Sequence, residues 1–177
     1  MDMEYKYTKI DLEKWNRGKL FQSYIDDMRI VMSLTVDIDV TNLIKFSKSH
    51  DLKFYPAMIW VVSKVVNEHD EFKYSWDNKG NLIKWDYISP SYTEFVANQP
   101  LNFFDVSCLP WVKYNHFDVH VFDEGKFLAP VITWGKYELE RERYIMPLTM
   151  NIHHAVADGF HLSRFFNEVQ ELINSIS

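Results

Sequence analysis

Glycine is scarce in this chain, with five residues among 177, where an average composition would supply about twelve. The five glycines stand apart from one another, so no Gly-x-Gly-x-x-Gly turn and no Walker-type phosphate loop can be written with them. The sequence therefore argues against a Rossmann or P-loop nucleotide site. Intrinsic disorder is also disfavoured, because bulky apolar residues run through the whole chain.

Cysteine, basic charge and long apolar runs are lacking as well. The single cysteine, Cys108, excludes an internal disulfide framework and a cysteine-based zinc site, and it fits a cytoplasmic protein. With 19 basic against 25 acidic residues and no basic block, the chain is not expected to bind nucleic acid. No apolar run approaches the roughly 20 residues of a membrane span. Residues 1–10 carry no signal-peptide core, so no membrane partner is expected.

Aromatic residues are abundant instead: 13 Phe, 10 Tyr and 6 Trp make up 16% of the chain. An aromatic-walled pocket, an extensive subunit interface and a plain aromatic-rich core would each account for this excess. Composition does not choose among them. The length predicts a single domain over residues 1–177.

Helical and strand patterns alternate in the first half of the chain. Asp11 is a plausible helix cap, and Pro56 is tolerated in the first turn of a helix. The spacing of apolar residues predicts helices over Asp11–Met28, over Thr41–Ser49 and from Pro56 onward. Strands are predicted at Glu4–Lys9 and Ile30–Ile38, and the turn Asp77-Asn78-Lys79-Gly80 predicts a hairpin between Phe72–Trp76 and Leu82–Trp85.

Strand patterns dominate the second half. The candidates are Phe103–Ser107, Val112–Phe122, Phe127–Trp134 and Arg143–Ile152. The last is largely apolar, so we expect it to be buried on both faces. A final helix carries one apolar stripe, formed by Leu162, Phe165, Phe166, Val169, Leu172, Ile173 and Ile176. The mixture predicts an α/β fold, an α+β two-layer sandwich of a mixed sheet covered by helices.

The segment His153-His154-Ala155-Val156-Ala157-Asp158-Gly159-Phe160-His161 joins the buried strand to the last helix. Adjacent histidines at the end of a buried strand are unusual, because a buried imidazole needs partners for its ring nitrogens. A satisfied core histidine followed by a helix cap is the alternative reading. Zinc binding is a further alternative, but neighbouring strand side chains diverge and no recognised ligand spacing is present. We therefore expect a catalytic histidine here and no metal.

That segment resembles the active-site signature of type A chloramphenicol acetyltransferases, in which a cysteine usually stands at the place of Ala157. Acyltransferase domains of 2-oxo-acid dehydrogenases share the shorter pattern His-x-x-x-Asp-Gly. Further segments follow in family order and extend the resemblance over nearly the whole chain. They are YTKIDLEKWNRGKLFQSY, KFYPAMIW, SYTEF, DVSCLPW, PVITWGKY and FFNEVQELINS.

By match to the family motifs, the resemblance implies a role for each of four residues. His154 would be the general base that removes the proton of an acceptor hydroxyl. Ser107 would stabilise the oxyanion, and Asp158 would pair with Arg17 as structural support. The implied acceptor-binding residues are Tyr24, Thr133, Phe117, Val119 and Val121. Lys136 and Tyr137 would lie near acetyl-CoA, the expected co-substrate.

The resemblance also implies a homotrimer with the sites between subunits and a small molecule as acceptor. It breaks after Phe95, where residues 96–102 replace a longer family segment that carries part of the acceptor pocket. Chloramphenicol O-acetylation therefore has two rivals, transfer to a different hydroxylated acceptor and a weakly active or non-catalytic relative. Completeness of the four-residue site favours an enzyme.

Overall fold

The computed structural model describes residues 6–92, 102–119 and 126–176 and contains two β-sheets. The larger sheet is mixed, because β5–β6 and β6–β7 are parallel pairs whereas β9 is antiparallel to β2, β7 and β8. Its strand order is β2 (Val31–Asp39), β9 (Arg143–His153), β7 (Val131–Gly135), β6 (Phe103–Leu109) and β5 (Ser89–Ser91), and β8 (Glu138–Glu140) also pairs with β9. The predicted mixed sheet is confirmed.

Strand β9 lies at the centre of this sheet and is buried on both faces from Met146 to His153, as predicted. Successive side chains point to opposite faces. Met146, Leu148, Met150 and Ile152 join the hydrophobic core. The alternate residues Thr149, Asn151 and His153 therefore form a polar stripe on the other face.

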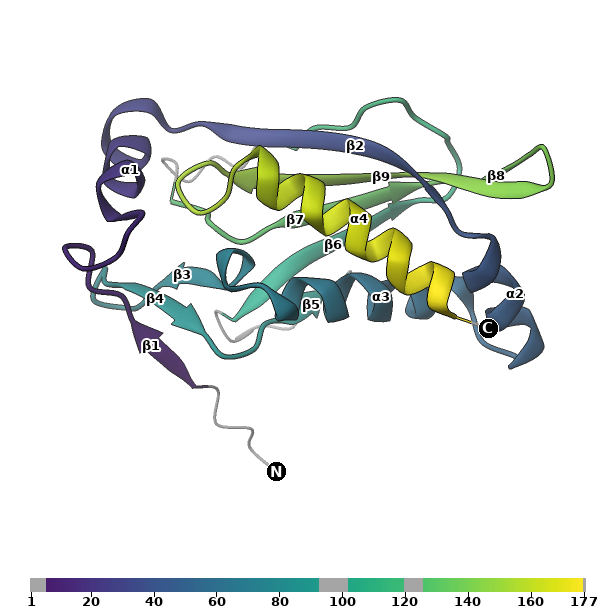
Figure 1. Cartoon of the computed structure of the whole chain (residues 1–177), viewed down its shortest axis with the longest axis horizontal. Coiled ribbons are helices and arrows are strands. Elements are labelled where there is room, and N and C mark those ends of the chain that lie inside the picture. The colour runs from purple at the N-terminus through teal and green to yellow at the C-terminus, as the bar shows by residue number, and fades with distance from the viewer. Residues whose placement is uncertain (1–5, 93–101, 120–125, 177) are drawn as a thin grey trace.

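Three helices form the second layer. They are α2 (Thr41–Ser49), α3 (Phe54–Glu68) and α4 (Gly159–Ser175). Figure 1 shows α4 crossing in front of the larger sheet, with β2 along the upper edge. The predicted apolar stripe of α4 provides its buried residues Leu162, Phe165, Phe166, Val169 and Ile173. The two-layer arrangement is thus confirmed, and α3 begins two residues before Pro56.

The smaller sheet has the order β1 (Tyr7–Lys9), β4 (Leu82–Trp85) and β3 (Tyr74–Trp76), and a short 3₁₀ helix, Asp70–Phe72, precedes β3. The predicted hairpin joins β3 to β4. Asp77 Oδ1 accepts hydrogen bonds from the amides of Lys79 and Asn81, each at 2.8 Å. Gly80 has φ of 75°, the left-handed conformation that glycine adopts at little cost.

The prediction of one helix over Asp11–Met28 is wrong. Residues up to Arg17 form turns, and α1 (Gly18–Ser23) continues into a π-helical turn, Tyr24–Met28. The turns bring the backbone so close that a Cβ at Gly18 would lie 1.9 Å from the carbonyl oxygen of Leu12. Spacing along the chain does not reveal such a close approach.

The prediction of a strand over Val112–Phe122 is also wrong for the part that the structure describes, up to residue 119. Because this segment connects the parallel neighbours β6 and β7, it must cross a face of the sheet and cannot pair with either strand. The strand predicted at Phe127–Trp134 begins only at Val131, after Pro130. The sequence did not predict β5 and β8.

Candidate active site

His154 directly follows β9, and its two ring nitrogens have different surroundings. Nδ1 lies 2.8 Å from the carbonyl oxygen of Ala157. A carbonyl can only accept, so Nδ1 carries a proton, and in the neutral imidazole the free lone pair therefore lies on Nε2. No residue in the described part of the chain bonds to Nε2. The ring of Tyr24, from the π-helical turn, stacks on the imidazole at a centroid distance of 4.3 Å, so the ring is held in one orientation.

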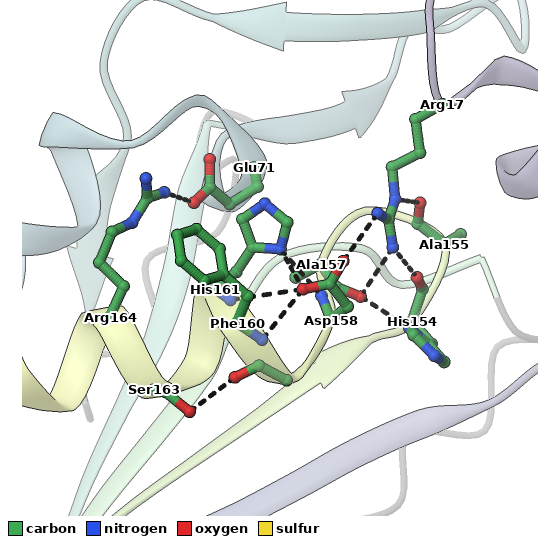
Figure 2. A network of polar contacts seen from close by, with 11 residues as sticks. Arg17, Glu71, His154, Ala155, Ala157, Asp158, Phe160, His161, Ser163 and Arg164 are labelled. Carbon is green, nitrogen blue, oxygen red and sulfur yellow. Dashed lines mark hydrogen bonds and ion pairs between the residues drawn. The ribbon is translucent and has the colours of Figure 1, made fainter.

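Arg17 holds the loop that follows His154. Its guanidinium donates to the carbonyl oxygens of Ala155 at 2.7 Å, His154 at 2.8 Å and Ala157 at 3.1 Å. Nη1 lies 3.2 Å from Asp158 Oδ2. Figure 2 shows the guanidinium facing these oxygens while the imidazole of His154 points away from it. Arg17 therefore shapes the loop without touching the imidazole of His154.

Asp158 is the N-cap of α4. Its Oδ1 accepts from the amides of Phe160 at 3.1 Å and His161 at 3.4 Å. His161 Nδ1 lies 2.7 Å from the same oxygen. Burial alone would raise the pKa of Asp158, but the attraction of His161 and the hydrogen bond from Arg17 outweigh it and lower the pKa below its usual value. The carboxylate is thus anionic at neutral pH and pairs with Arg17, as the sequence predicted.

Ser107 lies near the carboxyl end of β6 and lines a cavity of about 700 Å³, a size typical of small-molecule sites. The side chain is exposed, and its hydroxyl makes no hydrogen bond with any residue that the structure describes. Lys136 and Tyr137, the predicted coenzyme residues, line the same cavity. The rest of the lining comes from Phe54, Tyr55, Cys108, Pro110, Trp111, Trp134 and Gly135.

Sequence reasoning did not assign these seven lining residues to the site, although all seven fall in the quoted segments KFYPAMIW, DVSCLPW and PVITWGKY. The aromatic excess was the available signal, because four of the seven are aromatic. Burial raises the pKa of the Cys108 thiol to about 11. This cysteine is therefore a neutral wall residue at physiological pH and not a thiolate nucleophile.

Ser107 and His154 do not meet within one chain. Ser107 is paired with Thr133, and Thr133 with Thr149, which precedes His153 by four residues along β9. Two strand spacings of about 4.8 Å and four rises of about 3.4 Å separate Ser107 from His153 by roughly 17 Å. Each chain thus presents two separate half-sites, the cavity with Ser107 and the loop with His154.

The predicted acceptor residues are divided in the same way. Tyr24 lies on the imidazole of His154. Thr133 is fully buried beside Ser107, and its hydroxyl has no hydrogen-bond partner among the residues that the structure describes. Phe117 lies in the irregular segment over the sheet and packs on Tyr114 at 5.7 Å. Val119 is half-buried at the end of that segment, and Val121 lies outside the described residues.

Other kinds of site find no support in residues 6–92, 102–119 and 126–176. These residues contain no group of three His, Cys, Asp or Glu side chains able to hold a metal ion. None of their helices is long and apolar enough to cross a membrane.

Comparison with known proteins identifies the family. The family model for chloramphenicol acetyltransferase matches residues 5–99 and 95–170. The chain is 34% identical to a chloramphenicol acetyltransferase of Clostridium perfringens over 210 aligned positions, which cover 96% of each protein. It is 33% identical to chloramphenicol acetyltransferase 3 of Escherichia coli, over 96% of this chain and 98% of the relative. The chain belongs to the chloramphenicol acetyltransferase family.

Solved structures agree on the fold. A chloramphenicol acetyltransferase superposes with a TM-score of 0.85 at 21% identity, covering 97% of this chain and all of the other. The cubic core of a pyruvate dehydrogenase multienzyme complex superposes with a TM-score of 0.69 at 15% identity, over 96% and 92% of the two chains. The predicted chloramphenicol acetyltransferase-like fold is confirmed.

The family comparison also bears on the predicted internal deletion. The two matched pieces meet at residues 95–99, directly after the SYTEF segment. The alignment to the Clostridium relative runs over 210 positions although this chain has 177 residues. The family members therefore carry additional residues, and the break falls in residues 93–101, which lie outside the described part of the chain.

Proposed function

We propose that this chain is an acetyl-CoA-dependent O-acetyltransferase that transfers the acetyl group to a hydroxyl of chloramphenicol and acts in the cytoplasm. The observation that carries the proposal is the pair of half-sites, one with an oriented histidine and one with a serine in an aromatic cavity. The names of the family members support the same reaction. A single free cysteine fits a reducing compartment.

His154 is the general base in this proposal. Its Nε2 accepts the proton of the acceptor hydroxyl while the hydroxyl oxygen attacks the thioester carbonyl. The hydrogen bond from Nδ1 to Ala157 supports this role, because it fixes the tautomer that leaves Nε2 unprotonated. When the tetrahedral intermediate collapses, the C–S bond breaks and the imidazolium returns the proton to the departing CoA thiolate.

Ser107 stabilises the oxyanion of that intermediate through its hydroxyl. The cavity around Ser107 suits the acyl donor. Its size and aromatic walls suit an extended thioester arm. The exposed Lys136, whose Nζ lies 3.7 Å from Glu138 Oε1, adds a positive charge to the lining for a phosphate. Tyr137 packs edge-on against Phe54 at 5.2 Å, which gives the cavity a rigid aromatic side.

We also propose that two chains complete each site, in a homotrimer of single-domain subunits. The separation of roughly 17 Å between the half-sites supports this arrangement, because a general base must lie within hydrogen-bond reach of its substrate. The loop of His154 from one chain would face the cavity of its neighbour. Chloramphenicol would then lie between them, against the candidate residues Tyr24, Phe117, Val119 and Val121. Thr133, which is fully buried, would support the acceptor side from beneath the surface.

A second candidate is the same chemistry with another hydroxylated acceptor. It is favoured by the break in the family match at residues 95–99, where relatives carry additional residues. A wider, wetter acceptor side would weaken electrostatic stabilisation of the transition state.

A thiol-release assay with acetyl-CoA tests both candidates. The purified chain is offered chloramphenicol and a panel of other hydroxylated molecules. Release of CoA thiol with chloramphenicol supports the first candidate, and release only with other members of the panel supports the second. No release with any acceptor would contradict both and leave a non-catalytic relative.

A further inference from the structure

The irregular segment 110–119, which crosses the sheet between β6 and β7, is held down by a chain of side-chain hydrogen bonds. Tyr114 Oη lies 2.8 Å from the carbonyl oxygen of Thr133 and 3.1 Å from Thr149 Oγ1. Thr149 Oγ1 lies 2.8 Å from Thr35 Oγ1. Thr35 Oγ1 lies 3.4 Å from His116 Nδ1. This series of hydrogen bonds thus begins and ends on the same segment and involves residues of three strands, β7, β9 and β2.

The direction of these hydrogen bonds follows from the first one. The Thr133 carbonyl can only accept, so Tyr114 donates to it and accepts the proton of Thr149. Thr149 must then accept from Thr35, which in turn accepts from the protonated Nδ1 of His116. Thr133 and Thr149 are fully buried, so water does not compete for the two bonds of Tyr114, whereas the bond between Thr35 and His116 lies at the exposed end.

A second observation places the same tyrosine against the cavity wall. At Gly135, a lining residue of the cavity, a Cβ would lie 3.0 Å from Tyr114 Cδ1 and 2.9 Å from the carbonyl oxygen of Val112. Glycine at this position allows the segment to approach the sheet closely. Pro110 and Trp111, four and three residues before Tyr114, line the cavity themselves.

We propose that the Tyr114 hydroxyl is a positioning group that fixes the Pro110–Trp111 wall of the cavity and thereby sets the affinity for the acyl donor. The inference rests on the proposed function, because it takes that cavity as the acetyl-CoA site. Tyr114 itself touches neither Ser107 nor His154 in the contacts that the structure describes. Its loss therefore weakens binding of acetyl-CoA and leaves the chemical step largely intact.

Tyr114→Phe tests this, because it keeps the ring and removes the hydroxyl. The expected result is an increase of about fivefold in KM for acetyl-CoA, the effect of one net hydrogen bond, with kcat nearly unchanged. Tyr74→Phe is the matched control, since Tyr74 is also a largely buried tyrosine whose pKa burial raises to about 12, but it lies in β3 of the smaller sheet. This control should leave KM unchanged.

Limited trypsin digestion provides a readout that does not depend on activity. Lys113 directly precedes Tyr114 in the sequence. Cleavage after Lys113 in the folded protein should therefore become several-fold faster in Tyr114→Phe and remain unchanged in Tyr74→Phe. Thr149→Val should reproduce both effects and add little to them in the double variant, because it breaks the same chain of hydrogen bonds.

Wild-type cleavage and wild-type KM in Tyr114→Phe would overturn the proposal. Equal effects in Tyr74→Phe would also overturn it, because they would indicate general loss of stability. A wild-type chain without any acetyl transfer would instead contradict the proposed function, and the cleavage rate would still decide whether Tyr114 anchors the segment.

Discussion

At the scale of single residues, the decisive arrangement is the pair of contacts that fix the imidazole of His154. The Ala157 carbonyl selects the tautomer, and the ring of Tyr24 restricts rotation. Neither contact uses Nε2. The Ala157 carbonyl serves as the partner that a carboxylate provides for other oriented histidines, and Asp158 is instead engaged by Arg17 and by the first turn of α4.

Replacement of His154 by alanine should lower kcat by about 10²–10⁴-fold, the contribution of a positioned general base. The fold should remain, because the ring is only partly buried. Steady-state kinetics and thermal unfolding of His154→Ala check this, with His50→Ala, an exposed histidine at the end of α2, as the control. Near-normal turnover of His154→Ala would assign the base elsewhere.

At the scale of elements, the loop between β9 and α4 is built as one unit. Asp158 caps the helix, and Arg17 donates hydrogen bonds to three main-chain carbonyl oxygens of the loop. Because a lowered pKa means that the folded state prefers the ionised carboxylate, Asp158 stabilises the fold above its unfolded pKa of about 3.9. This contribution is lost as the pH falls through the lower folded-state value.

Asp158→Asn removes the charge and keeps a good cap. At pH 7 it should cost about 1 kcal/mol or less of unfolding free energy, since the side chain is about a third exposed. The difference from wild type should begin to shrink below about pH 4, the unfolded pKa, and should vanish only below the lowered folded-state pKa of Asp158. Urea unfolding at pH 7 and at pH 3 measures it, with the exposed Asp86→Asn as control. A difference independent of pH would contradict the role of the charge.

The elements show which features the sequence makes predictable. Helix α2 has the predicted bounds, Thr41–Ser49, because its apolar residues repeat at the helical period within one uninterrupted stretch. The prediction of a strand at Val112–Phe122 was wrong because the conformation of this segment depends on β6 and β7 being neighbours in the sheet. That arrangement is a long-range property of the fold. Local pattern determines local structure and not which neighbours are available for pairing.

The candidate site was predictable to a different degree. The resemblance identified His154, Ser107, Asp158 and Arg17, and the structure contains the predicted Arg17–Asp158 pair. The three bonds from Arg17 to main-chain oxygens could not be foreseen, because carbonyl groups carry no sequence signature. The cavity wall was missed for a similar reason: its residues come from α3, β6, β7 and the segment after β6, and only the fold brings them together.

At the scale of the whole molecule, the two half-sites predict how inactive variants should complement each other. Ser107→Ala should lose about 10²-fold in turnover, as for one oxyanion donor, and His154→Ala should be nearly inactive. Co-expression of both should restore about a quarter of wild-type activity, because each site between subunits would draw at random on two chains. Activity of the co-expressed pair no higher than that of the single variants would contradict a shared site. A doubly substituted chain co-expressed with His154→Ala serves as the control.

The hydrogen bonds from Arg17 to the loop of His154 also have a consequence for folding. The loop residues that Arg17 contacts lie 137 to 141 positions after it in the sequence. Such contacts form only after a large loop has closed, so they belong to the slow, non-local part of folding. Local contacts such as that of Ala157 therefore do not alone complete the surroundings of His154, the proposed general base. The loop that carries this histidine reaches its final conformation only when Arg17 meets it, so we expect the proposed catalytic site to form late in folding.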